Sequence, residues 1–209
     1  NLSTSSATIS WVTEASVKGS VVPVLSGNEK SPVVDKRGNE NRNTHYVELT
    51  SLEPNTKYDF KIASGSDEYA SLDSITMSFK TAPITAGTPT PNPIHGTVTE
   101  SSGDDVIVYA MLKDKSVYPV SAVIPSGGNW ITDLSAFRKI SDYSLVLTEN
   151  TTNLVLVSVG GPDKGAIVQG TYTSLFDSNG KLKSTNDFTI GNNSNLYTYF
   201  AAKSMLMAE

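Results

Sequence analysis

Apolar and polar side chains alternate in several short stretches of the first third of the chain. Every second residue is apolar in residues 47–50 and again in residues 57–62, and the same alternation occurs in residues 7–11 and 75–80. A period of two is typical of β-strands that bury one face and expose the other. The pattern therefore predicts at least four strands, with their apolar faces turned toward one core.

The turn between the two central stretches carries the pattern of a tyrosine corner. Pro54 fixes the backbone of this turn, and Leu52 and Tyr58 are spaced to pack beneath it. In Greek-key sandwiches a tyrosine at this place buries its ring and directs its hydroxyl to upstream main chain. We therefore expect the Tyr58 hydroxyl to bond main chain near Leu52 or Glu53. The core is predicted to contain Trp11, Leu52, Tyr58, Phe60 and Phe79.

Residues 1–83 resemble a fibronectin type III domain. The segment ATISW resembles the second strand of that family with its core tryptophan, L-x-P-x-T-x-Y resembles its corner, and SFKTAP resembles its last strand. The resemblance implies a Greek-key sandwich. The family has a first strand ahead of the ATISW segment, and this chain has almost nothing there, so that strand was either cut away or is supplied by another chain.

A proline-rich segment follows, in residues 84–93. Pro89, Pro91 and Pro93 occupy alternate positions, which removes main-chain donors and favours an extended polyproline conformation. Such a segment is expected to act as a semi-rigid linker between two domains. Part of it could instead pair at the edge of the following domain.

The second half of the chain is predicted to form another sandwich, in residues 94–195. Residues 154–157 are apolar without alternation, which predicts a central strand covered on both faces. The order and spacing of the strands resemble a carboxypeptidase regulatory-like domain, a transthyretin-like sandwich. The predicted strands are Ile94–Thr99, Asp105–Leu112, Tyr118–Ile124, Trp130–Leu134, Tyr143–Leu147, Asn153–Val159 and Ala166–Tyr172.

The last segment, residues 196–209, is apolar and aromatic. It could fold as a short helix onto the second domain, begin a third domain, or be a strand donated to the open sandwich of a neighbouring molecule. Packing of this tail within its own chain would argue against donation. The candidate assembly residues are Leu196, Tyr197, Tyr199 and Phe200.

Composition narrows the class of protein. The chain has 209 residues, no cysteine and a net charge of −5. A length of this order suits two domains. The missing cysteines exclude disulfides and thiolate metal sites, and they favour a bacterial or archaeal surface protein or a cytosolic protein. The acidic balance without a basic tract argues against nucleic-acid binding. No apolar run approaches the roughly 18 residues that span a bilayer, so no membrane insertion is expected of this segment.

Candidate reactive residues each have a simpler interpretation. His45 and His95 are expected to be surface or edge histidines. Ser178 and Lys181 have a spacing used in acyl transfer, but Asn179-Gly180 between them predicts a hairpin turn. Asp163 and the pair Asp104-Asp105 could bind calcium, yet no loop carries the series of oxygen ligands that a calcium site needs. We therefore expect no catalytic residue, no metal and no cofactor.

These observations predict an all-β protein with two tandem Greek-key sandwiches joined by a proline-rich linker. The predicted function is that of a non-enzymatic, extracellular or cell-surface module that acts as a spacer, adhesion or assembly unit. Its partners would be proteins or carbohydrates at the cell surface, neighbouring domains, or further copies bound through terminal strands. Two alternatives are accessory domains of an extracellular hydrolase and a subunit of a surface filament assembled by strand exchange.

Overall fold

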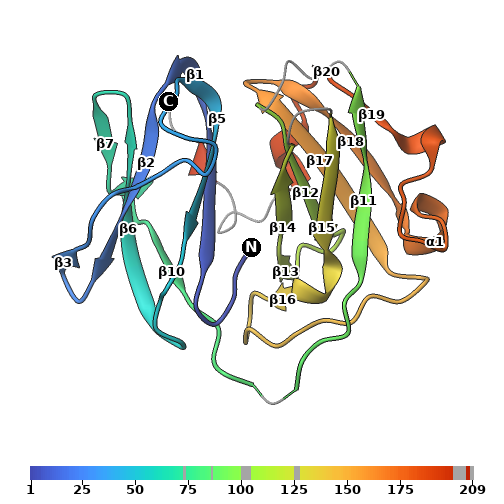
Figure 1. Ribbon diagram of the computed structural model, residues 1–209, viewed down its shortest axis with the longest axis horizontal. Coiled ribbons are helices and arrows are strands. Elements are labelled where there is room, and N and C mark those ends of the chain that lie inside the picture. The colour runs from blue at the N-terminus through green and yellow to red at the C-terminus, as the bar shows by residue number, and fades with distance from the viewer. Residues whose placement is uncertain (73, 86, 100–104, 125–127, 200–205, 208–209) are drawn as a thin grey trace. The chain divides into compact units, whose positions relative to one another are not determined.

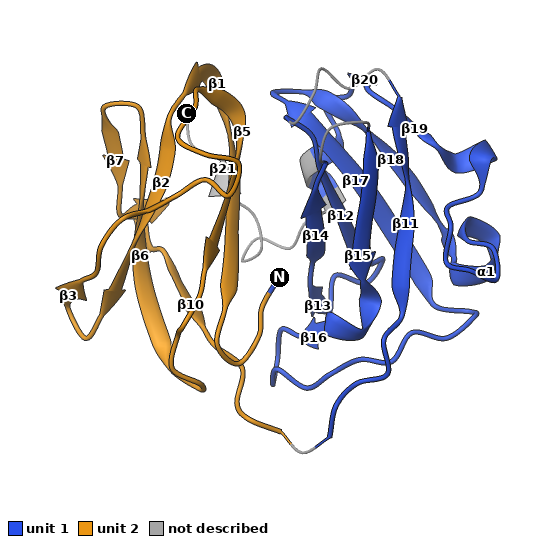
Figure 2. Cartoon of the chain, viewed as in Figure 1, with its two compact units in different colours: residues 1, 87–205 blue, residues 2–86, 206–209 orange. Residues whose placement is uncertain are grey.

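Short strands, mostly antiparallel, account for most of the regular structure of this chain, as the ribbon in Figure 1 shows. The computed structural model describes residues 1–72, 74–85, 87–99, 105–124, 128–199 and 206–207. The chain divides into two compact units, coloured orange and blue in Figure 2. The N-terminal sandwich comprises residues 2–86 and 206–209, and the C-terminal sandwich comprises residue 1 and residues 87–205. Each has a hydrophobic core of its own.

Two sheets form the N-terminal sandwich. One has three strands in the order β21-β1-β5, and the other has the order β10-β6-β2-β3, with β4 also paired to β2 and β7 also paired to β6. The strands are β1 (Ala7–Val17), β2 (Gly19–Leu25), β3 (Asn28–Glu29), β4 (Val33–Val34), β5 (Arg42–Leu49), β6 (Lys57–Ser64), β7 (Asp67–Tyr69), β10 (Ser78–Lys80) and β21 (Leu206–Met207). A separate hairpin joins β8 (Ser71–Leu72) to β9 (Ile75–Thr76).

The alternation seen in the sequence places the N-terminal core. Strands β1 and β5 are antiparallel, with Ile9 opposite Val47 and Ala7 opposite Leu49. Because alternate side chains of a strand point to the same face, these residues meet the inward side chains of β2 and β6. The buried cluster contains Ile9, Trp11, Val21, Val47, Leu49, Phe60, Ile62 and Met77, with Val33, Leu52, Tyr69 and Phe79 packed against it.

The C-terminal sandwich also has two main sheets. One has three strands in the order β15-β11-β19, with β19 parallel to β11, and the other has five in the order β14-β12-β17-β18-β20. These strands are β11 (Pro93–Thr99), β12 (Ile107–Leu112), β14 (Val120–Val123), β15 (Asn129–Asp133), β17 (Asn153–Gly161), β18 (Lys164–Thr171), β19 (Phe188–Thr189) and β20 (Gly191–Asn192). The remaining elements are the pair β13 (Val117–Tyr118) and β16 (Arg138–Lys139), the helix α1 (Tyr172–Leu175), and the 3₁₀ turns η1 (Leu134–Ala136), η2 (Ser184–Asn186) and η3 (Leu196–Tyr199).

Most of the strands expected in this half are present. The non-alternating run Leu154–Val157 lies in β17 between β12 and β18, and all four side chains are buried. The expected strand Tyr143–Leu147 is wrong. Leu145 forms an isolated bridge to Arg138 and is not part of a strand. Tyr143, the first residue of the expected strand, has a positive φ of 64°, which is incompatible with extended backbone.

The proline-rich segment ends inside the second sandwich. Pro93 is the first residue of β11 and lies opposite Asp133 of β15. One residue earlier, the Asn92 N–H donates to the Asp133 carboxylate at 2.9 Å, and the Leu134 N–H donates to the Asn92 carbonyl at 3.0 Å. The chain is therefore held to the sheet from Asn92 onward.

Candidate functional site

The tyrosine corner is closed by hydrogen bonds to main chain. The Glu53 N–H donates to the hydroxyl of Tyr58 at 2.9 Å, and the buried Tyr58 ring stacks on Phe79 with 5.5 Å between ring centroids. Phe79 in turn contacts Phe60, with their centroids 5.9 Å apart. Tyr58 thus joins the core of the N-terminal sandwich through Phe79.

A second side chain, Thr81, locks the same corner. Its hydroxyl donates to the Glu53 carbonyl at 2.6 Å and accepts the Thr56 N–H at 2.9 Å, and the residue is fully buried. Pro54 lies between these bonded residues and Asn55 follows it with a positive φ of 53°. Thr81 was not singled out in the sequence because it stands 25 residues from its partner Thr56, and no local pattern connects them.

Replacing Tyr58 with phenylalanine should destabilise the N-terminal sandwich by about 1 kcal/mol, or more where the Glu53 N–H stays without an acceptor. The ring is retained, so its packing on Phe79 should persist. Urea unfolding, followed through the buried Trp11, measures this loss. An unchanged midpoint would show that the Tyr58 hydroxyl contributes nothing to the corner.

Trp11 and His45 form a buried aromatic pair that contacts Ser64, at the end of β6 away from this corner. Their rings stack with centroids 4.6 Å apart and planes inclined by 19°. The Trp11 indole N–H donates to the Ser64 hydroxyl at 2.9 Å, and the His45 Nε2 lies 3.2 Å from the Thr13 hydroxyl. A Cβ on Gly19 would come within 2.3 Å of the imidazole, so glycine is required there.

His45 was expected to be a surface or edge histidine; it lies on an edge strand, but the expectation of a surface position is wrong. Its side chain is fully buried. Residues 45, 47 and 49 point to the same face of β5, so His45 shares the inward face with Val47 and Leu49. The imidazole is accommodated because Trp11 supplies a ring face and Thr13 a hydroxyl. His95 lies on β11 and is partly exposed, and it pairs through its main chain with Gly180 and Leu182.

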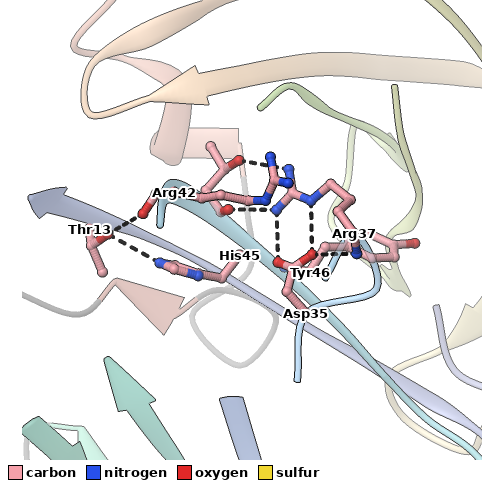
Figure 3. Close-up of polar contacts among 7 residues, drawn as sticks. Thr13, Asp35, Arg37, Arg42, His45 and Tyr46 are labelled. Atoms are coloured by element: carbon pink, nitrogen blue, oxygen red, sulfur yellow. Dashed lines mark hydrogen bonds and ion pairs between the residues drawn. The ribbon is translucent and has the colours of Figure 1, made fainter. Parts of the chain in front are cut away.

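A buried ion pair joins Asp35 and Arg37 at the edge of β5 that lies opposite β1 (Figure 3). The Arg37 side chain donates to both Asp35 oxygens, from Nε at 2.9 Å and from Nη2 at 2.8 Å, and the Arg37 and Asp35 side chains are only 6% and 2% exposed. The Asp35 carboxylate also accepts the Tyr46 N–H at 2.6 Å. Arg37 further donates to the Thr44 carbonyl at 2.5 Å and to the Thr44 hydroxyl at 3.2 Å.

The electrostatics of this pair favour the ionised carboxylate. Burial by itself raises the pKa of Asp35, but the hydrogen bonds from the Arg37 side chain, from the Arg37 and Tyr46 N–H groups, and the guanidinium charge together hold that pKa below its usual value. The pair therefore contributes stability at neutral pH that is lost as the pH falls through the lowered pKa of Asp35.

Polar side chains of the C-terminal sandwich likewise bond neighbouring main chain. The Asp177 carboxylate accepts the Asn179 and Lys181 N–H groups at 2.8 and 3.0 Å, which builds the turn that the Asn-Gly pair predicts. Ser178 and Lys181 are therefore parts of that turn. Asp133 caps η1 by accepting the Ser135 N–H at 2.8 Å, besides holding Asn92.

One aromatic pair in this sandwich is partly exposed. The rings of Tyr118 and Tyr143 stack with centroids 6.0 Å apart, and the Arg138 guanidinium donates to the Tyr143 carbonyl at 3.0 Å. Burial raises the pKa of the Tyr118 hydroxyl, and the neighbouring Tyr143 adds to the rise. This contact fixes the Tyr143 turn against β13.

The candidate assembly residues are divided between different places. Leu196 is fully buried, and its side chain would lie within 2.8 Å of a Cβ on Gly165, so it packs on β18 of the C-terminal sandwich. Tyr197 and Tyr199 belong to η3, and their side chains, like the whole of Phe200, lie outside the described residues. Farther along, β21 pairs with β1 of the same chain. That pairing lies within one chain, which argues against donation of this strand to a neighbouring molecule.

The residues that the structure describes include no group of three or more histidine, cysteine or acidic side chains that could hold a metal ion. Asp104, considered as a calcium ligand together with Asp105, lies outside the described residues. Within the described part of the chain, no helix is both long and apolar enough to cross a membrane.

Comparison with known proteins finds likeness to solved structures only. No family model and no curated protein matches the chain. Among solved structures, the chain is similar to the FN1–FN3 domains of chicken CNTN1, with 9% sequence identity and a TM-score of 0.30. The match covers 81% of this chain and 62% of that one, so the chain spans less than two thirds of that structure. The all-β sandwich fold stated above rests on the sheets and their registers.

Proposed function

We propose that this chain is a non-catalytic, extracellular or cell-surface module that acts as a spacer, adhesion or assembly unit. Its N-terminal sandwich is proposed to be a fibronectin type III domain. This interpretation is supported by the hydrogen bond that closes the corner at Tyr58 and by the position of Trp11 in the core. Its C-terminal sandwich is proposed to be carboxypeptidase regulatory-like, supported by its two-layer arrangement of three and five strands. Proteins or carbohydrates at the cell surface, or neighbouring domains, are its proposed partners.

One observation carries the proposal of a structural role. Several buried or half-buried polar side chains in the two sandwiches bond main-chain groups that hold turns and edges, as Asp35, Thr81 and Asp133 do. Polar side chains used in this way fix the backbone of a sandwich. Without them, these main-chain groups would lack hydrogen-bond partners, which would cost free energy. This distribution suits a module whose task is to keep its shape.

The proline-rich segment supports the spacer role in particular. Residues 84–92 carry Pro89 and Pro91, and the segment is anchored to the second sandwich at Asn92. Prolines restrict the backbone to extended conformations, so we propose that this segment separates the two sandwiches as a semi-rigid linker.

A spacer of two sandwiches should resist stretching in two separate steps. Because the chain has no cysteine, handles can be attached through Ser5→Cys and Ser194→Cys. Pulling in an optical trap should give two unfolding events, each lengthening the chain by roughly 300 Å, since an extended residue spans about 3.6 Å. The cysteine-free chain is the control for specific attachment. Extension without a resolved unfolding force would contradict the spacer role.

A further inference from the structure

The outer side of β5 and the outer side of β1, in the three-stranded sheet of the N-terminal sandwich, are covered by different kinds of segment. On the β5 edge, the Lys36 N–H donates to the Tyr46 carbonyl at 2.8 Å, and the Asp35 carboxylate accepts the Tyr46 N–H. Arg37 occupies the Thr44 carbonyl on the same edge. A further strand cannot bond the Tyr46 N–H, the Tyr46 carbonyl or the Thr44 carbonyl, because these main-chain groups are already bonded. The buried ion pair in Figure 3 therefore seals this edge.

The hydrogen bonds at the β5 edge also determine which main-chain N–H and carbonyl groups of β1 point to its outer side. Tyr46 and Thr44 direct their main-chain groups away from β1, so the pairs Ser10–Tyr46 and Val12–Thr44 are the ones without mutual hydrogen bonds. In an antiparallel ladder the partners in such pairs both point outward. Ser10 and Val12 therefore present their N–H and carbonyl groups at the outer edge of β1.

That outer edge receives a strand from the far end of the chain. β21 runs parallel to β1, with Leu206 opposite Trp11 and Met207 opposite Val12. β1 has 11 residues, and the strand pairings described on its outer side are this pair of residues and an isolated bridge from Leu2 to Ala7. The inward side chains Ile9 and Trp11 belong to the core cluster of the sandwich, so what the edge offers an added strand is main-chain pairing.

We infer that the outer edge of β1 is a strand-acceptor site whose occupant is the segment Leu206–Met207 of the same chain. The segment docks parallel to β1 by β-augmentation, in which main-chain hydrogen bonds provide the affinity. The site recognises an extended peptide of this kind and is closed in cis. This inference concerns what fills the edge, and it stands independently of the spacer role.

Hydrogen exchange at the Val12 amide tests the inference in the full-length chain, because this N–H faces β21. Leu206→Pro removes a main-chain donor and disfavours a paired strand, so exchange at Val12 should accelerate about tenfold or more. Leu206→Ala is the matched control, since it keeps the donor and should leave the exchange rate within about twofold. Unchanged exchange in the proline variant, or equal acceleration in both variants, would overturn the inference.

Two further measurements decide where the strand comes from. A synthetic peptide of residues 200–209, added to the Leu206→Pro chain, should restore slow exchange at Val12. The unmodified chain should be a monomer by light scattering at concentrations where Val12 is protected. Protection that appears only together with a dimer would assign the strand to a second copy and overturn closure in cis. The amides of β17 serve as the internal reference, because they belong to the C-terminal sandwich.

Discussion

Replacing Arg37 with alanine should destabilise the N-terminal sandwich by about 3–5 kcal/mol, the cost of leaving one partner of a buried ion pair without its counter-charge. The Asp35 carboxylate would remain buried and would lose both side-chain hydrogen bonds from Arg37, and the Thr44 carbonyl would lose its donor at the sheet edge. Urea unfolding followed by the fluorescence of Trp11 measures the loss. A stability that stays within about 1 kcal/mol of the wild type would show that the pair does not seal the edge.

Lys36→Ala is the matched control for this experiment. Lys36 is adjacent in sequence and forms an ion pair with Glu48 at 2.8 Å, but its side chain is 50% exposed. Exposed pairs contribute about 0.2–1 kcal/mol, so this variant should remain close to the wild type. If Lys36→Ala destabilises the sandwich as much as Arg37→Ala does, the loss of stability belongs to the loop as a whole and not to the buried ion pair.

The effect of Arg37→Ala should also depend on pH. Asp35 has a lowered pKa in the folded protein, so its ion pair stabilises the fold above the pKa of an unfolded aspartate, about 3.9, and this stabilisation disappears as the pH falls through the lower folded value. The difference in stability between wild type and Arg37→Ala should therefore shrink below about pH 4. A difference that is constant down to acid pH would show that Arg37 acts through packing alone.

Truncating one core residue in each sandwich should destabilise only the sandwich that contains it. Ile62 belongs to the N-terminal cluster and Leu156 to the C-terminal cluster, and both are fully buried. Replacement of either by alanine removes buried methyl groups and leaves a cavity, with an expected loss of about 2–5 kcal/mol. Each sandwich has one buried tryptophan, Trp11 or Trp130, so fluorescence of single-tryptophan variants follows each unit separately.

The local features of the fold could be predicted from the sequence. The tyrosine corner is contained in seven consecutive residues, 52–58, so its geometry follows from the proline and from the spacing of Leu52 and Tyr58. The central strand at Leu154–Val157 is likewise evident, because four successive apolar residues can be buried only when both faces of a strand are covered.

His45 shows where residue type misleads and periodicity does not. Its polarity favoured a surface position, whereas the alternation with Val47 and Leu49 assigns it to the core. The position follows the alternation because Trp11 stacks on the imidazole and Thr13 bonds it. Periodicity outweighs residue type when neighbouring strands supply a partner for the polar atoms.

The edge seal and the docked tail could not be predicted in detail because both depend on contacts between distant segments. Asp35 lies in a loosely patterned loop, and only the approach of that loop to Tyr46 gives its carboxylate a role. The apolar composition of the tail predicts that it packs against other residues. Its register on β1 could not be predicted, because it pairs residues almost 200 positions apart. Short sequence windows contain no signal for such pairings.

Scanning calorimetry of the intact chain tests most directly the claim that two sandwiches with separate cores make up this protein. The wild type should show two transitions, with Ile62→Ala lowering the midpoint of one and Leu156→Ala lowering the midpoint of the other. A single cooperative transition that both substitutions shift together would contradict the claim.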